Sequence, residues 1–222
     1  FCLEVIDSSG TESCEPACIT VIVIPDEAIH VELTWTTAGD TVIEPKEGVE
    51  GNGSDMDLHF AHPFSTGPNS LNPDIDGDGV GDPWFGEPFD CFWFNKAPNW
   101  GTFDPEVSDD PRLDRDDFDG WGPENLNIDI PEDGRSYQIG VHYWNPWCFG
   151  DSLATIRVFI YGELDVEILD VPMTGRDMWY VGEIPWTAGV GKTTVFTEAD
   201  GSYRITPNYA NPLLQPPIAC NP

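Results

Sequence analysis

Short runs of alternating apolar and polar residues recur along the chain between clusters of Gly, Pro, Asn and Asp, and helical periodicity is almost absent. In the clearest run, Ile29, Val31, Leu33 and Trp35 alternate with polar side chains. Because successive side chains of a strand point to opposite faces, this run predicts a strand with one packed and one solvated face. The pattern therefore predicts an all-β fold.

Less regular runs predict the remaining strands. They are residues 1–6, 18–24, 56–60, 91–94, 126–130, 137–144, 153–161, 164–169, 193–197 and 203–206. Strands of this length, separated by turn signals, favour an antiparallel β-sandwich of the jelly-roll or immunoglobulin-like kind. Two long connections, residues 62–88 and 97–123, lack the apolar periodicity to hold themselves in place, and we expect a bound ligand to organise them.

The first 24 residues predict a β-hairpin with its turn near Ser9 and Gly10, which sets Cys2 almost opposite Cys18. This segment resembles the last two strands of a PKD-type immunoglobulin-like domain, a family of extracellular spacer and adhesion modules. An isolated hairpin is marginally stable in water. Its partners are therefore expected from elsewhere in this chain, from a preceding domain or from a neighbouring subunit by donor-strand pairing.

The six cysteines contain no CxxC pair and no zinc-finger spacing, which indicates disulfides formed in an oxidising compartment. The pairings we expect are Cys2 with Cys18 and Cys91 with Cys148. Both expectations place the protein outside the cell or on its surface.

The net charge limits the classes of partner that the protein can bind. The 222 residues carry 40 Asp and Glu against 9 Lys and Arg, a formal net charge of −31. Nucleic acids and anionic lipids would be repelled, and no apolar run is long enough to predict membrane insertion. Carboxylates in this number also repel one another. Bound divalent cations would offset this repulsion, and a surface adapted to high salt is the alternative explanation.

The sharpest motif is a DxDGDGxxD loop. Its acidic residues are Asp74, Asp76, Asp78 and Asp82. Calcium takes about 6 to 8 oxygen ligands, and alternate aspartates in a glycine-bent loop supply them. The EF-hand pattern fails because Phe85 stands at its twelfth position. The motif is more similar to the calcium loops of dockerin and thrombospondin-type repeats, and a solvated acidic turn is the simpler alternative.

A second acidic segment has six aspartates within residues 109–119. From this segment and its continuation, the candidate calcium ligands are Asp114, Asp116, Asp117, Asp119 and Glu124. Asp55 and Asp57 lie two apart on a predicted strand and therefore share one face. Strand carboxylates and a distant acidic loop can close a calcium site between them, although an ordinary polar face explains the pair too.

The segments GSDMDLHF, DDPRLDRDDFDGWGPENLNIDIPEDG and YQIGVHYW resemble the domain of YfaP-like secreted bacterial proteins, over residues 29–162. The resemblance implies an extracellular β-sandwich module; it does not imply a catalytic activity. It also supports joining Asp55 and Asp57 to the loop of residues 114–124. Residues 65–88 are an insertion relative to the simple form of the domain. Calcium binding by the DxDGDGxxD loop is therefore predicted from its own aspartates and not from the resemblance.

Aromatic residues are dense, and two interpretations remain open. An exposed platform would bind sugar rings, whereas buried rings would form the core. The tryptophans considered for a platform are Trp84, Trp93, Trp100, Trp121, Trp144 and Trp147. No Ser/His/Asp arrangement or nucleotide-binding loop is legible. Paired carboxylates suited to glycoside hydrolysis remain a weaker alternative.

These patterns predict three parts: an immunoglobulin-like terminal hairpin (1–25), an acidic calcium-binding sandwich (26–163) and a C-terminal β segment with an extended tail (164–222). The function we expect is that of a calcium-stabilised extracellular structural or adhesion module, without enzymatic activity, including a subunit of a filament or surface assembly. Its partners would be copies of itself or neighbouring extracellular subunits. The alternative is a carbohydrate-binding module with a glycan as its ligand.

Overall fold

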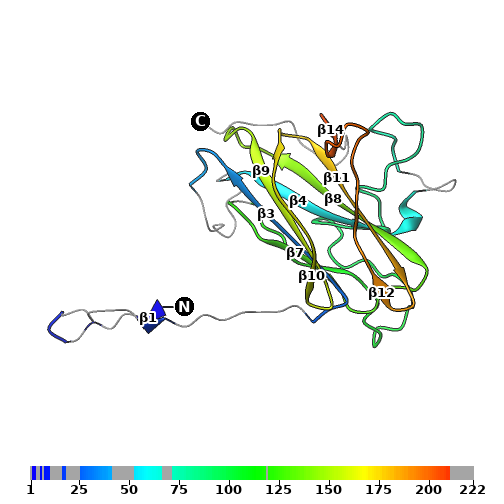
Figure 1. Ribbon diagram of the computed structural model, residues 1–222, viewed down its shortest axis with the longest axis horizontal. Helices are drawn as coiled ribbons and strands as arrows, with labels where there is room; N and C mark the ends of the chain where they lie inside the picture. Colours follow the sequence, from blue (N-terminus) through cyan, green and yellow to red (C-terminus); the bar gives the residue numbers. More distant parts are fainter. Residues whose placement is uncertain are drawn as a thin grey trace.

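The computed structural model describes residues 26–41, 53–66, 72–118 and 120–210, together with residues 2–3, 6, 8–10 and 17–18 near the N-terminus. Two antiparallel sheets face each other in a β-sandwich (Figure 1), which confirms the predicted fold class. Within these ranges no helix has the length and apolar character needed to cross a membrane.

One sheet has five strands in the order β10-β9-β3-β7-β6. Its strands are β3 (Ile29–Thr37), β6 (Arg112–Arg115), β7 (Glu124–Ile128), β9 (Ser152–Ile160) and β10 (Glu163–Met173). In β3, Ile29, Val31, Leu33 and Trp35 are all buried and the residues between them are more exposed. The alternation read from the sequence is confirmed there.

The other sheet has the order β12-β11-β8-β4-β5, and two further short strands also pair with β11. Its strands are β4 (Asp55–Ala61), β5 (Asp90–Cys91), β8 (Arg135–Asn145), β11 (Met178–Thr187), β12 (Val190–Gly191), β13 (Thr194–Val195) and β14 (Arg204–Thr206). A short 3₁₀ helix, η1 (Pro63–Ser65), follows β4. The segment after residue 163 therefore supplies β10 and β11, one to each sheet.

Near the N-terminus, β1 (Cys2–Leu3) and β2 (Ala17–Cys18) form a separate antiparallel pair. The backbone of Cys2 lies opposite that of Cys18, which confirms the predicted register. Their side chains lie outside the described residues, so a bond between them stays a prediction. The predicted Cys91–Cys148 bond is wrong, because Cys91 is a free, buried thiol packed in the core. Cys148 is disulfide-bonded, to a cysteine other than Cys91.

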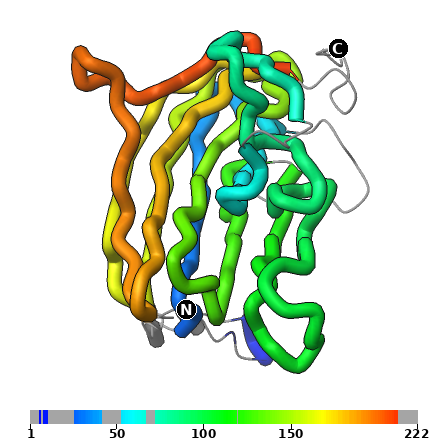
Figure 2. The backbone as a smooth tube through the Cα atoms, turned by 90° about the vertical axis from the view of Figure 1, so that its right-hand side faces the viewer, coloured from blue at the N-terminus to red at the C-terminus, as the bar shows by residue number. Residues whose placement is uncertain are grey.

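Every residue of β4 is buried, on both faces of its sheet. Met56, Leu58 and Phe60 face the core between the two sheets. The opposite face lies under residues 72–100, which we call the cover segment. Figure 2 shows this segment, teal to green, along one side of the sandwich. It packs Trp84 and Phe85 into a second apolar cluster on the outer face of the sheet.

Gly140 in β8 makes room for that cluster. A Cβ atom at this position would lie 2.8 Å from the indole ring of Trp84, closer than side-chain carbons approach one another. The cover segment is also tied to the strands by polar contacts. The Asp90 carboxylate accepts hydrogen bonds from the Phe85 N–H (2.6 Å) and pairs with the His59 ring (2.7 Å). The outer face of β4 is therefore a buried, partly charged surface.

Candidate metal centre

Three carboxylates converge at the end of the sandwich where β4 begins. Asp57 lies in β4, Asp116 follows β6, and Glu124 is the first residue of β7. One oxygen from each lies within 4.8 Å of the others. The sequence interpretation that joined Asp57 to the second acidic segment therefore placed residues together that the fold does bring together.

Local backbone geometry explains how these segments meet. A Cβ atom at Gly53 would lie 2.4 Å from the backbone nitrogen of Gly120, so only glycine permits this close approach. The contact sets the acidic segment beside the start of β4. Glu124 then joins the two sheets, because its Oε2 accepts the N–H of Leu58 in β4 (2.7 Å) and its Oε1 accepts the N–H of Asp117 (3.2 Å).

Two of the three carboxylates are buried, and Asp116 is partly buried. Asp57 is 3% exposed and Glu124 is fully buried. Burial, together with the neighbouring carboxylates, raises the pKa of Asp57 and of Glu124 well above their ordinary values. The Oδ2 atom of Asp57 has no hydrogen-bond partner among the described residues. A buried oxygen of this kind is costly unless something binds it.

The basic side chains that act on the cluster are Lys96, His142 and His59, of which His59 pairs with Asp90 at 2.7 Å. Lys96 donates to the Oδ2 of Asp116 at 2.8 Å, but its own side chain is 50% exposed. The Nδ1 of His142 lies 4.0 Å from the Oδ2 of Asp57, and burial lowers the pKa of His142 to about 3. His142 is therefore neutral at physiological pH. Lys96 is the basic group in direct contact with the cluster, through Asp116, and its ammonium is half exposed, while His59 is paired with Asp90.

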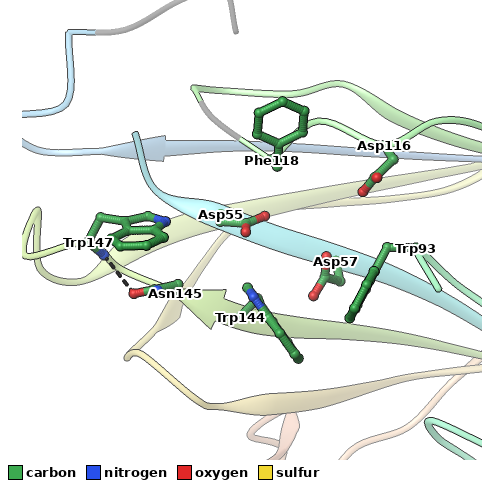
Figure 3. Close-up of a pocket in the computed structure, with 8 residues that line it drawn as sticks. All are labelled: Asp55, Asp57, Trp93, Asp116, Phe118, Trp144, Asn145 and Trp147. Atoms are coloured by element: carbon green, nitrogen blue, oxygen red, sulfur yellow. Dashed lines mark hydrogen bonds between the residues drawn. The ribbon is translucent and has the colours of Figure 1, made fainter. Parts of the chain in front are cut away.

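A cavity of about 310 Å³ opens beside the cluster. Its lining residues are Asp55, Asp57, Trp93, Asp116, Phe118, Trp144, Asn145 and Trp147. Figure 3 shows Asp55 and Asp57 between the indole rings of Trp147 and Trp93, with Trp144 below them and Asp116 and Phe118 above. Asp55 lies opposite Asn145 in the β4–β8 ladder, so the two strands form the floor of this cavity.

The DxDGDGxxD loop forms a separate acidic group at the surface. Oxygens of Asp74, Asp76 and Asp78 lie within 4.8 Å of one another, as the spacing predicted. Asp82 does not belong to this group. It is 3% exposed, and its oxygens accept hydrogen bonds from the Ile75 N–H (2.7 Å) and from the hydroxyls of Tyr180 (3.1 Å) and Tyr209 (3.0 Å). Asp82 therefore anchors the loop.

Two other predicted ligands, Asp114 and Asp117, lie outside the cluster, in different surroundings. Asp114 points away from the cluster, pairs with Arg112 (3.0 Å) and accepts a hydrogen bond from Asn127. Asp117 is fully buried and pairs with Arg115 at 3.1 Å. Asp119 lies outside the described residues. Among the residues that the structure describes, neither Asp114 nor Asp117 belongs to a group of converging ligand atoms.

The six tryptophans considered for a sugar-binding platform differ in their exposure and in whether they line the cavity. Trp84 and Trp100 are buried, at 0% and 4% exposure, and cannot present a free ring face. Trp121 is 37% exposed but does not line the cavity. Trp93, Trp144 and Trp147 do line it. Sequence reasoning missed Lys96 and Asn145, since nothing in their local sequence shows that distant strands bring them to the site.

Comparison of the chain with protein-family models, with curated proteins and with solved structures gave no match. The resemblances to YfaP-like and PKD-type domains therefore stay predictions, and the functional argument rests on the site itself.

Proposed function

We propose that the protein is a calcium-stabilised structural or adhesion module of the extracellular space. The observation that supports this most directly is the convergence of Asp57, Asp116 and Glu124 from three separate segments, with their oxygens within 4.8 Å. Like charges this close repel strongly in a buried site. A hard divalent cation among them replaces the repulsion with attraction.

The ligand chemistry favours calcium over other metals. All three converging groups are carboxylates, the oxygen ligands that calcium and magnesium prefer, whereas zinc favours nitrogen and sulfur. The ring of His142 belongs to no such group. Calcium also accepts irregular geometry and a high coordination number, which suits ligands from a strand and a loop better than the strict octahedron of magnesium does.

A cation here would stabilise the fold as a whole. Asp57 belongs to one sheet and Glu124 to the other, while Asp116 lies in the connection between β6 and β7. Binding only to the folded chain stabilises it by about 2.7 kcal/mol when free calcium is about 100 times the dissociation constant. The disulfide bond of Cys148 supports the extracellular part of the proposal, because disulfides persist in oxidising compartments.

The direct test is isothermal titration calorimetry of calcium into chelator-stripped protein. We expect heat of binding in the wild type and its loss at the buried site in Asp57→Asn. Glu163→Gln, which removes one exposed charge at the far edge of the other sheet, should bind as the wild type does. Asp74→Asn, in the surface loop, assigns any second binding event.

Two results would contradict the proposal. One is the absence of calcium heat in the wild type together with an unchanged melting temperature. The other is proton sharing between Asp57 and Glu124 that calcium does not alter, which would favour an acid–base pair instead. For an assembly role, light scattering and negative-stain microscopy should show particles larger than the monomer with calcium; a monomer with and without chelator would exclude a filament.

A further inference from the structure

The lining of the cavity beside Asp57 is both acidic and aromatic. Asp55, Asp57 and Asp116 supply its carboxylates, and Trp93, Trp144 and Trp147 supply the indole rings around them (Figure 3). Its volume of about 310 Å³ lies at the lower end of the range for small-molecule sites, about 300 to 1,000 Å³. A ligand for this site must therefore combine polar groups along one edge with an apolar face.

The protein ligands leave a cation incompletely coordinated. Both oxygens of Glu124 already accept backbone N–H groups, and one oxygen of Asp116 accepts from Lys96. Each of these two side chains then supplies about one ligand atom, while calcium needs about 6 to 8. The Oδ2 of Asp57, buried and without a hydrogen-bond partner, is a further ligand atom in the cavity wall. Asp57 and Asp116 also line the cavity, so an exogenous ligand there can supply oxygen atoms to the same cation.

The aromatic part of the lining is built to hold its shape. The rings of Trp93 and Trp144 pack edge to face, with centroids 5.2 Å apart. The backbone N–H of Trp147 donates to the Oδ1 of Asn145 at 3.0 Å, drawn as the dashed line in Figure 3. All three tryptophans are only partly buried, so each keeps some ring surface accessible. Such rings stack against the C–H face of a pyranose while its hydroxyls point elsewhere.

Charge restricts the ligand further. The acidic lining and the formal charge of −31 disfavour phosphorylated, sulfated or carboxylated ligands. We propose that the cavity binds a neutral sugar, with two adjacent hydroxyls on the bound calcium and the ring against the tryptophans. This inference rests on the proposed calcium site and adds the chemical class of its ligand.

The test follows intrinsic tryptophan fluorescence while methyl α-mannoside, methyl β-galactoside and methyl β-glucoside are added, with a glycan array run in parallel. We expect at least one of them to bind in calcium and none in EGTA. A permethylated glycoside, which has no free adjacent hydroxyls, should not bind. Trp147→Ala should weaken sugar binding by about 2- to 12-fold, the loss expected for one aromatic contact, while calcium affinity is unchanged.

Trp121→Ala is the matched control, because it removes a partly exposed indole that does not line the cavity. If calcium binds but no glycoside or array glycan does, the sugar inference is overturned and the calcium site stands. Sugar binding that survives EGTA overturns it as well. If calcium itself does not bind, both proposals fail.

Discussion

Replacing Asp57 by Asn should have opposite effects on stability with and without calcium. The change keeps the shape of a buried side chain that is 3% exposed and removes its charge. Two unit charges 4.8 Å apart repel by about 3.5 kcal/mol at an effective dielectric of about 20. Because the pKa of Asp57 is raised by burial, protonation already relieves part of this repulsion. We therefore expect a gain of about 1 to 3 kcal/mol in the calcium-free protein.

For a chain of this length, that gain raises the melting temperature by about 2 to 12 °C in EGTA. Calcium reverses the ranking. At about 1,000 times its dissociation constant, calcium stabilises the wild type by about 4.1 kcal/mol, which the variant does not gain and which exceeds the variant's advantage in EGTA. The assay is differential scanning calorimetry of both proteins in EGTA and in calcium, with Glu163→Gln as the control that loses one charge on an exposed strand edge.

Two outcomes would refute this reasoning. If Asp57→Asn is less stable than the wild type in EGTA, the Asp57 carboxylate is satisfied by the protein alone and the repulsion argument is wrong. If calcium stabilises both proteins equally, the cation binds elsewhere. The surface loop with Asp74 would then be the site to examine, by the corresponding Asp74→Asn variant.

Three further predictions concern the surroundings of the site. Asp82→Ala leaves buried donors without an acceptor and should cost about 3 to 5 kcal/mol in urea unfolding, whereas Asp82→Asn should cost less; equal losses would contradict this. Burial lowers the pKa of His142 to about 3, so below about pH 6.5 the unfolded chain binds a proton that the folded chain does not. The free energy of unfolding therefore decreases as the pH is lowered, by up to about 1.4 kcal/mol per pH unit. His142→Gln should flatten that dependence in unfolding measured from pH 7 to 4, and parallel curves would disprove it. Lys96→Gln removes the ammonium that competes for Asp116 and should tighten calcium binding several-fold by calorimetry, so an unchanged affinity would count against the shared site.

The sequence predicted those features that local alternation determines. The period-two pattern of β3 specified its buried face, and the same rule set Asp55 and Asp57 on one face of β4. It missed β11 (Met178–Thr187), for which there is a physical reason. Residues 178–182 are all buried, because the core covers one face and the cover segment the other, so no alternation marks them. Pro185 also argues against a strand in the sequence, because proline cannot donate a hydrogen bond to a neighbouring strand.

Tertiary placement limited what the sequence could say about the site. Asp114 and Asp116 are two apart in one acidic segment, yet only Asp116 reaches Asp57, since a register shift between Leu113 and Arg115 changes the course of β6. Similarly, the spacing of the DxDGDGxxD motif gave no sign that Asp82 would be buried beneath two tyrosine hydroxyls. Partners contributed by distant strands decide both cases.

The cover segment connects the two acidic groups, and it overlaps the insertion predicted from the resemblance to YfaP-like domains. Residues 72–100 carry the surface aspartates, the anchor Asp82, the cavity-lining Trp93 and the counter-charge Lys96. Most of the insertion predicted relative to that family lies within this same segment. Among the described residues, 72–88 contribute none of the main core between the sheets, whereas Cys91 and Trp100 of the cover segment pack in it beside Met56, Leu58 and Phe60. Trp93 and Lys96 follow residue 88 and therefore lie outside the predicted insertion, so the aromatic cavity and the charge balance at Asp57 do not depend on inserted residues, whereas the surface aspartates of the DxDGDGxxD loop do.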